Sequence, residues 1–361
     1  MESSDRRIEQ FARQFPENGM KLLLQNPSNA RDLLALAGRD LVGLIDTEHM
    51  QLVQTTFVKR DYRHVESDIV LVAPYRRADG LGARNLLVYI LIEHQSAPDR
   101  LMPLRLLDYL VQIYNFQTRR WAKEHRSLAR VRLQPVLPVV FYTDTRRWDS
   151  VGQLIDLVPA GAPFASATPV FAPVFLNLPR IEPEILESAG GFLGWVLRLV
   201  QQRRARPEPF RALLQRVVAH LERMAADQRL RWLELLSYSL ALVYHERDPE
   251  ERSALHHTIE TSVATDAARK ELSKMGKTIA DQLKEEGARE GERRGERRGE
   301  RNAAIMTRQQ TLVRLLKKRF GEVPTGMTDT IRATRDVQQL DRWLDQCVTA
   351  ERLDDFDFGD V

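Results

Sequence analysis

Two short segments place acidic and amide side chains beside strand-like apolar runs. They are Tyr62-Arg-His-Val-Glu-Ser-Asp-Ile-Val70 and Ile90-Leu-Ile-Glu-His-Gln-Ser96. Carboxylate oxygens suit hard divalent cations such as Mg²⁺, which keep further coordination positions for water and phosphate. A bound cation lowers the pKa of its water and neutralises charge that develops at phosphorus. The residue types therefore indicate the chemistry of phosphodiester hydrolysis.

A hairpin would bring these residues together. If the two strands pair symmetrically about the turn at 79–82, the numbers of opposed residues sum to 161, so Asp68 faces Glu93 and Glu66 faces Gln95. Alternate residues of a strand share a face, which puts all four side chains on one side at the end far from the turn. Two opposed carboxylates repel each other unless a cation lies between them.

A plainer reading competes with the metal site. Charged residues at strand ends are mostly exposed, and a one-residue bulge would move Asp68 away from Glu93. Glu66 is more simply a surface strand residue, and His94 is expected to pack on the opposite face of the sheet. The dipeptide His256-His257 has no partner ligands at metal spacing, so it is not expected to hold an ion.

The elements that must position these residues follow from the apolar pattern. We expect a helical entry segment, two strands joined by the glycine-containing hairpin, a largely buried helix, and two more strands. Their ranges are 5–52 for the entry, 65–73 and 86–92 for the hairpin, 101–123 for the helix, and 136–142 and 170–176 for the later strands. This succession predicts an α/β or α+β fold with a mixed sheet flanked by helices.

After Pro183 the strand signal ends, and helical periodicity is found at 192–201, 210–225 and 230–244. We expect a core at 1–183, a helical subdomain at 184–283, a charged linker at 284–301 and a C-terminal helical module at 302–361. In the linker, 13 of 18 residues are charged and the unit Gly-Glu-Arg-Arg repeats.

The repeat has two readings. It is a solvated linker helix or spacer, because each helical glycine costs about 1 kcal/mol and nothing apolar is available to bury. Alternatively its glycines, which recur every four residues, allow a close helix–helix contact, or its cations contact phosphate. Seven Lys and Arg against six Glu in this segment give only a weak drive towards DNA.

Composition narrows the class of protein. The 361 residues hold 54 Lys and Arg, 50 Asp and Glu, 43% apolar residues and one cysteine, Cys347. One thiol excludes an intramolecular disulfide framework and a cysteine-built zinc site, so a reducing cytoplasm is expected. No apolar run approaches the ~18–20 residues that cross a bilayer, and no membrane partner is expected. The net charge of +4 is compatible with a polyanionic partner but does not require one.

The Glu-Ser-Asp and Leu-Ile-Glu-His-Gln-Ser segments, with Arg105 and Tyr109 on the following helix and the strand Val136-Leu-Pro-Val-Val-Phe-Tyr142, resemble the bacterial Rpn family. These are recombination-promoting, transposase-like nucleases within the PD-(D/E)XK superfamily. The charged repeat and the C-terminal module also resemble the tails of many such proteins. The resemblance implies a restriction-endonuclease-like core that acts on DNA with Mg²⁺, in which Asp68 and Glu93 form the metal-binding acidic pair.

Gln95 stands where the wider superfamily usually has lysine. Glutamine can orient a water or the scissile phosphate by hydrogen bonding, but it cannot act as a base at neutral pH. Arg105 could supply the missing positive charge, or it could simply reach the surface of its helix. The arginines at the end of that helix and beyond it could contact the phosphate backbone, or could be solvated; they are Arg119, Arg120, Arg126, Arg130 and Arg132.

Three hypotheses follow. The first is a Mg²⁺-dependent DNA endonuclease of low sequence specificity, linked to recombination or mobile elements, in which Asp68, Glu93 and Gln95 are catalytic. The second is a catalytically inactive, transposition-associated DNA-binding protein that forms homo-oligomers through its C-terminal helices. The third is a structural helical oligomeriser in which the acidic pair is merely exposed.

Overall fold

A computed structural model covers the chain. It describes residue 15 and residues 18–38, 43–53, 69–76, 87–125, 127–159, 162–224, 226–263 and 266–353. The chain divides into two compact units, Met1–Ala280 and Asp281–Val361. No helix in the described ranges is long and apolar enough to cross a membrane.

A five-stranded mixed sheet organises the first unit, with the strands in the order β1-β2-β3-β4-β5. β1, β2 and β3 pair antiparallel, whereas β3, β4 and β5 pair parallel. The strands are β1 Gln51–Leu52, β2 Ile69–Pro74, β3 Leu87–Gln95, β4 Val136–Tyr142 and β5 Val174–Asn177. The mixed α/β sheet expected from the sequence is therefore confirmed.

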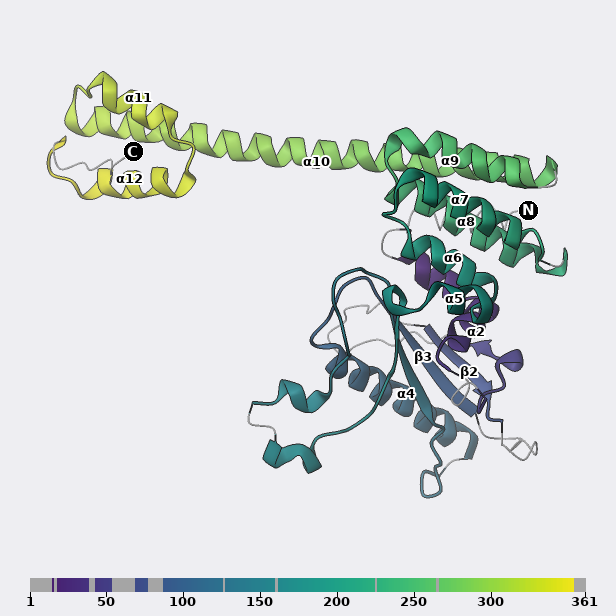
Figure 1. Ribbon diagram of the computed structural model, residues 1–361. Helices are drawn as coiled ribbons and strands as arrows, with labels where there is room; N and C mark the ends of the chain where they lie inside the picture. Colours follow the sequence, from purple (N-terminus) through teal and green to yellow (C-terminus); the bar gives the residue numbers. More distant parts are fainter. Residues whose placement is uncertain are drawn as a thin grey trace. The chain divides into compact units, whose positions relative to one another are not determined.

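The register of the central hairpin is also as predicted. Six pairs run from Ile69 opposite Ile92 to Pro74 opposite Leu87, and the two residue numbers of every pair sum to 161. β2 and β3 lie next to each other in the sheet (Figure 1). Successive side chains of both strands are buried, so both faces of this hairpin are covered.

Two predicted elements have different bounds in the structure. The strand expected at 170–176 begins only at Val174, because Pro173 has no N–H to donate to a sheet ladder. The entry segment is helical over part of its predicted range, but its end forms β1, a two-residue strand. β1 pairs with β2 and both of its residues are exposed, so it carries no alternating pattern that the sequence could reveal.

Helix α4, Met102–His125, lies against one face of the sheet (Figure 1). The core between them contains Tyr89 and Leu91 of β3 together with Leu106, Tyr109 and other residues of α4. Because alternate residues of β3 share a face, Tyr89, Leu91, Glu93 and Gln95 all belong to the side that α4 covers. The helix expected at 101–123 is confirmed.

Further helices and 3₁₀ turns complete the first unit, before, between and after the strands. They are α2 Pro27–Ala35, α5 Pro183–Ala189, α6 Gly191–Gln201, α7 Pro207–Leu221, α8 Arg229–Glu246 and α9 Pro249–Ser262, with the 3₁₀ turns η1 Thr47–His49, η2 Leu154–Leu157, η3 Ala162–Ala167, η4 Leu178–Arg180 and η5 Ala226–Gln228. The helices predicted at 192–201, 210–225 and 230–244 correspond to α6, α7 and α8.

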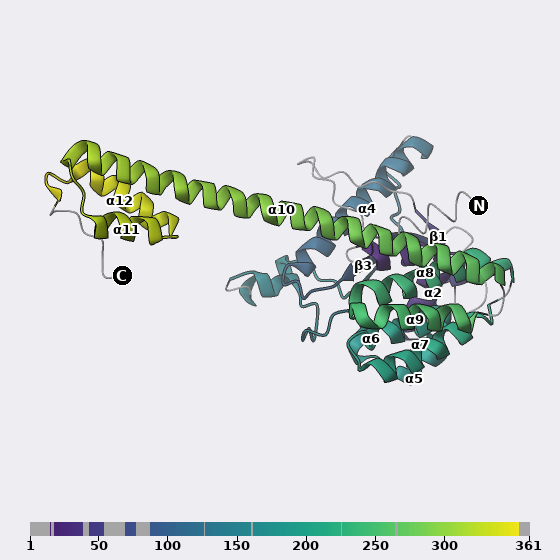
Figure 2. The ribbon, with the colours of Figure 1, turned by 90° about the horizontal axis from the view of Figure 1, so that it is seen from above.

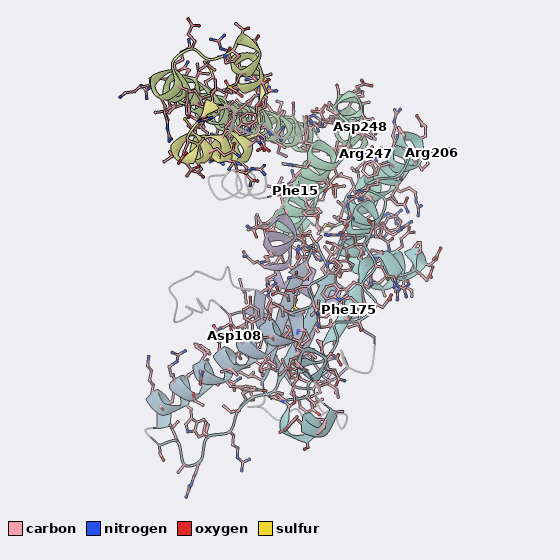
Figure 3. All side chains as sticks on the ribbon, turned by 90° about the vertical axis from the view of Figure 1, so that its left-hand side faces the viewer. Phe15, Asp108, Phe175, Arg206, Arg247 and Asp248 are labelled. Carbon is pink, nitrogen blue, oxygen red and sulfur yellow. The ribbon has the colours of Figure 1, made fainter. Side chains whose placement is uncertain are left out.

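Two buried arginines hold these helices together. Arg231 of α8 pairs with Asp32 of α2, and the same carboxylate accepts a hydrogen bond from Leu193 N near the start of α6. Arg247 lies between α8 and α9 (labelled in Figure 3) and donates to the carbonyl oxygens of Arg203 and Ala205 at 2.9 and 2.7 Å. Each guanidinium therefore joins segments that are distant in the sequence.

The second unit is helical. The 55-residue helix α10, Asp266–Phe320, begins in the first unit and continues into the second, where it includes the Gly-Glu-Arg-Arg repeat. Its C-terminal part packs with α11 Thr325–Ala333 and α12 Val337–Thr349 around a core that includes Leu312, Ile331 and Trp343 (Figure 2). In the repeat, residues 291–300 are all exposed, and a Cβ built on Gly291, Gly295 or Gly299 would meet no atom within 4 Å. These glycines make no close contact among the described residues.

Candidate functional site

Glu93 is a buried acid in a strand that is otherwise mainly apolar. It lies near the C-terminal end of β3, opposite Val140 of the parallel strand β4, and its side chain is 0% exposed. A carboxylate removed from water requires charged or hydrogen-bonding partners. The groups around Glu93 therefore determine what chemistry this carboxylate can take part in.

Two side chains donate to the same oxygen of Glu93. Gln95 Nε2 lies 2.6 Å from Glu93 Oε1, and the guanidinium of Arg105 lies 2.5 Å from it through Nη2. Gln95 follows Glu93 by two residues on the same face of β3, and Arg105 is in the first turn of α4. The alternation of side chains along β3 thus brings Gln95 to Glu93, and the first turn of α4 brings Arg105 to it.

The other side of Arg105 contacts a second acid. Its Nη1 donates to Asp99 Oδ2 at 3.1 Å, while Asp99 Oδ1 accepts the backbone N–H of Leu101 at 2.8 Å. Burial alone would lower the pKa of Arg105, but the charge of Glu93 and hydrogen bonds with Tyr109 and Asp99 outweigh it and raise the pKa. The guanidinium therefore stays charged at any physiological pH.

Asp99 is a site residue that the sequence analysis missed. It follows Pro98 and lies three residues before α4 begins at Met102, a pattern typical of the approach to a helix N-terminus. Asp144 was missed as well. It is buried just after β4, with Arg146 Nε at 2.5 Å and Arg203 Nη2 at 3.6 Å. Its own arginine partners account for its burial.

The other half of the predicted acidic pair is not described. Asp68 and Glu66 lie outside the described residues, so their positions opposite Glu93 and Gln95 stay predictions. Within the described ranges no group of three or more His, Cys, Asp or Glu side chains is placed to hold a metal ion. The donors that are described at the site, a carboxylate and an amide, offer the hard oxygen atoms that Mg²⁺ prefers. Glu93 is the charged one of these two donors.

The expectation for His94 is confirmed. Its Nε2 lies 2.9 Å from Thr143 Oγ1, and its ring centroid lies 5.9 Å from that of Phe141. Phe141 and His94 are paired across β3 and β4, on the face opposite Glu93. Burial and the nearby charge of Lys21 lower the pKa of His94 to about 3, so its ring is neutral.

The predicted phosphate-binding arginines Arg119 and Arg120 are not brought to Glu93. Both are exposed, and Arg120 Nε pairs with Glu124 at 2.9 Å. They follow Arg105 by 14 and 15 residues on one straight helix, which at 1.5 Å per residue separates them from it by about 21 Å. They lie at the far end of α4, and so does the segment that carries Arg130 and Arg132.

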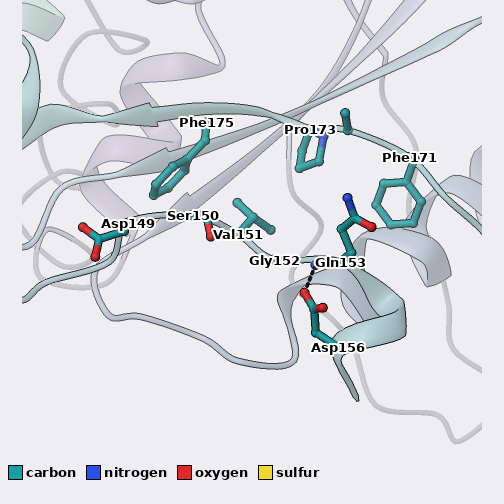
Figure 4. A pocket seen from close by; sticks show the side chains of 10 residues that line it. Asp149, Ser150, Val151, Gly152, Gln153, Asp156, Phe171, Pro173 and Phe175 are labelled. Atoms are coloured by element: carbon teal, nitrogen blue, oxygen red, sulfur yellow. Dashed lines mark hydrogen bonds between the residues drawn. The ribbon is translucent and has the colours of Figure 1, made fainter. Parts of the chain in front are cut away.

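A pocket lies away from these groups. It has a volume of about 650 Å³ and is formed by residues 149–153, 156, 171–173 and 175, beside β5 (Figure 4). None of the predicted site residues lines it.

His256 does not contact the described residues around Glu93. Its Nδ1 lies 3.0 Å from Tyr244 Oη, and its Nε2 lies 3.5 Å from Glu260.

The fold and the site together define an α/β protein whose mixed sheet carries a buried carboxylate at the end of a parallel strand, bridged to a helix arginine. Residues 17–229, more than half of the chain, match the family model described as "Putative transposase, YhgA-like". The chain belongs to this family. The Rpn-family resemblance is therefore confirmed.

Curated relatives agree with that assignment. Over 138 residues the chain is 30% identical to "Recombination-promoting nuclease RpnD" of Escherichia coli O157:H7, covering 38% of this chain and 48% of RpnD. It is 28% identical over 123 residues to "Recombination-promoting nuclease RpnA" of E. coli K12, covering 34% and 37%. The chain thus spans about half or less of the length of these two nucleases.

A third relative carries a different description. Over 105 residues the chain is 31% identical to "Putative inactive recombination-promoting nuclease-like protein YjiP" of E. coli K12, which covers 28% of this chain and 96% of YjiP. No solved structure matches significantly. The relatives therefore include proteins named as nucleases and one named as inactive.

Proposed function

We propose that the protein is a divalent-cation-dependent DNA endonuclease in which Glu93 holds the cation. The observation that carries this proposal is a fully buried carboxylate at the C-terminal end of an apolar central strand, with an amide and a guanidinium both directed at one of its oxygens. Two relatives named as recombination-promoting nucleases support it. We infer that the reaction serves recombination or mobile elements.

The described residues have separate roles in this proposal. Mg²⁺, when bound, would activate a water and neutralise charge on the phosphate. Glu93 would bind it together with Asp68, which the predicted register places opposite. Gln95, already 2.6 Å from Glu93, would orient the water or the phosphate by hydrogen bonding. Arg105, with a planar guanidinium and 38% of its side chain exposed, would bind a phosphate oxygen.

A second candidate function rests on the same ion pair. Arg105 already neutralises Glu93, and a site that is permanently neutralised in this way has no need of a metal. A catalytically inactive DNA-binding protein that oligomerises through its C-terminal helices is the alternative, and the description of YjiP is in keeping with it.

Nicking of supercoiled plasmid distinguishes the two functions. The purified full-length protein should convert supercoiled DNA to the open-circular form with Mg²⁺ and should not do so in EDTA. Asp68→Asn and Glu93→Gln should each abolish nicking, because each removes a negative charge but keeps the side-chain shape. DNA binding without nicking at any divalent-cation concentration would favour the second function, and nicking that survives both substitutions would disprove the site.

A further inference from the structure

The Arg105–Glu93 pair is asymmetric in its access to water. The side chain of Glu93 is 0% exposed, whereas that of Arg105 is 38% exposed. The backbone of Glu93 is paired with Val140 in the sheet, and its side chain is enclosed by protein. The guanidinium, in contrast, ends a long flexible side chain and can turn towards solvent by changing rotamer.

A second acid holds the outer side of the same guanidinium. Asp99, 25% exposed, lies 3.1 Å from Nη1, while Glu93 lies 2.5 Å from Nη2. Asp99 is fixed in turn by the N–H of Leu101 at the start of the helix. Arg105 therefore has an inner and an outer carboxylate partner, and it can lose the inner one without becoming an isolated charge.

Arg105 already neutralises the negative charge of Glu93, so little charge is left to attract a second cation. A guanidinium at 2.5 Å from Oε1 supplies a positive charge where a divalent cation would have to bind, and two cations in contact with one carboxylate oxygen repel each other strongly in a site of low dielectric. Gln95, which also donates to Oε1, carries no charge and adds no such repulsion. Competition for Glu93 is thus between Arg105 and a cation.

We propose that Arg105 competes with divalent cations for Glu93, and that binding of a nucleic-acid phosphate draws its guanidinium away and so opens the site to the metal. This inference rests on the proposed function, because it takes Glu93 as the metal ligand. It makes metal binding and DNA binding mutually reinforcing: a phosphate that engages Arg105 raises the affinity for the cation, and by linkage the cation raises the affinity for the phosphate.

The test is the affinity of the DNA-free, full-length protein for Mn²⁺ and Mg²⁺, measured by isothermal titration calorimetry. Arg105→Gln removes the charge but retains an amide that can donate to Glu93. We expect it to bind the metal about tenfold more tightly than the wild type, a size typical of coupling between two sites. The matched control is Arg100→Gln, which removes the charge of an exposed arginine five residues away and should leave the affinity unchanged.

A second measurement tests whether the guanidinium of Arg105 binds a DNA phosphate. In EDTA, Arg105→Gln should bind a short DNA duplex more weakly than the wild type, and the slope of log affinity against log salt should fall by about 1, as expected for the loss of one phosphate contact. Tighter metal binding combined with weaker DNA binding is the pattern that the proposal requires. A merely structural arginine would produce neither change.

The outcomes are distinguishable from those of the nicking assay. Unchanged or weaker metal binding by folded Arg105→Gln would overturn the competition even if the wild type cleaves DNA. If Arg105→Gln does not fold, Arg105→Lys takes its place, because lysine keeps the charge but cannot bridge Glu93 and Asp99. We expect Arg105→Lys to bind the metal more tightly than the wild type, but by less than tenfold. An affinity for the metal equal to that of the wild type would contradict the proposal. Absence of metal binding by every protein, with Glu93→Gln as the blank, would overturn both the competition and the metal site.

Discussion

Arg105 and Glu93 join helix α4 to strand β3 through a hydrogen-bonded ion pair of 2.5 Å, in which the acid is fully buried and the base reaches solvent. The pair links an element that covers the sheet to the strand at its centre. It is the point at which the fold and the proposed chemistry depend on the same two side chains.

The two partners should differ in their effect on stability. Arg105→Met removes the positive charge beside a carboxylate that cannot reach water, and we expect a loss of about 2–4 kcal/mol in the free energy of unfolding. Glu93→Gln leaves an arginine that can be hydrated and should cost about 1 kcal/mol. Urea denaturation at pH 7 measures both values. Equal losses would show that the asymmetry in burial has no energetic consequence.

The Asp32–Arg231 pair is buried on both sides, with 11% and 6% of the side chains exposed. Arg231→Met should lower the free energy of unfolding by about 3–5 kcal/mol, because it leaves a buried carboxylate without its cation. The double variant Asp32→Leu, Arg231→Met should recover part of that loss, although Leu193 N loses its acceptor. Chemical denaturation of the three variants tests this order, which a double variant less stable than Arg231→Met would contradict.

His245 should make stability depend on pH. Burial and the charge of Arg252 lower the pKa of His245 to about 4, against about 6.5 in the unfolded chain. Below pH 6.5 the unfolded state therefore binds a proton that the folded state does not, and the free energy of unfolding falls as the pH drops towards 4. Between pH 7 and pH 5 this group should contribute a loss of about 1–2 kcal/mol.

His245→Gln is the variant that isolates this contribution. The ring of His245 stacks on Phe15 at 5.0 Å between centroids, so the substitution also costs packing at every pH. The comparison is therefore between pH slopes and not between absolute stabilities. An identical slope in the variant would exclude His245 as a source of acid sensitivity.

Substitution of the repeat's glycines by alanine should show whether the repeat is a solvated helix or a site of close helix–helix contact. Gly291, Gly295 and Gly299 have open space at the position of a Cβ, and alanine favours a helix over glycine by about 1 kcal/mol per position. The triple alanine variant should therefore raise the helicity and the melting temperature that circular dichroism records. If these glycines instead allow close contact between copies, the variant would dissociate in sedimentation experiments.

The sequence predicted the register of the central hairpin because both strands are apolar and a glycine-containing turn signal at 79–82 stands between them. The pairing of Ile69 with Ile92 follows from those two facts alone. The contact between Arg105 and Glu93 could not be predicted in the same way, since it depends on how α4 is rotated about its axis against the sheet. Asp99 was overlooked for the same reason, because its partner is set by the position of that helix.

Other differences arise where local signals are weak. Gln51 and Leu52 form an edge strand with two exposed side chains, too short for any periodicity. The arginines near residue 120 are close to the site in sequence, but the rigid length of α4 carries them to its far end. Residues that are near the site in the sequence can therefore lie far from it in space, and the sequence alone could not place these arginines.

The most direct test of the central claim is the single-turnover rate of DNA cleavage at saturating Mg²⁺, compared between the wild type, Glu93→Gln and the control Glu124→Gln. Glu124 is an exposed acid on α4 that pairs with Arg120. We predict that Glu93→Gln lowers the rate by at least 100-fold, the order of loss expected when a group that stabilises the transition state is removed, and that the control retains the wild-type rate. A wild-type rate in Glu93→Gln would contradict the account.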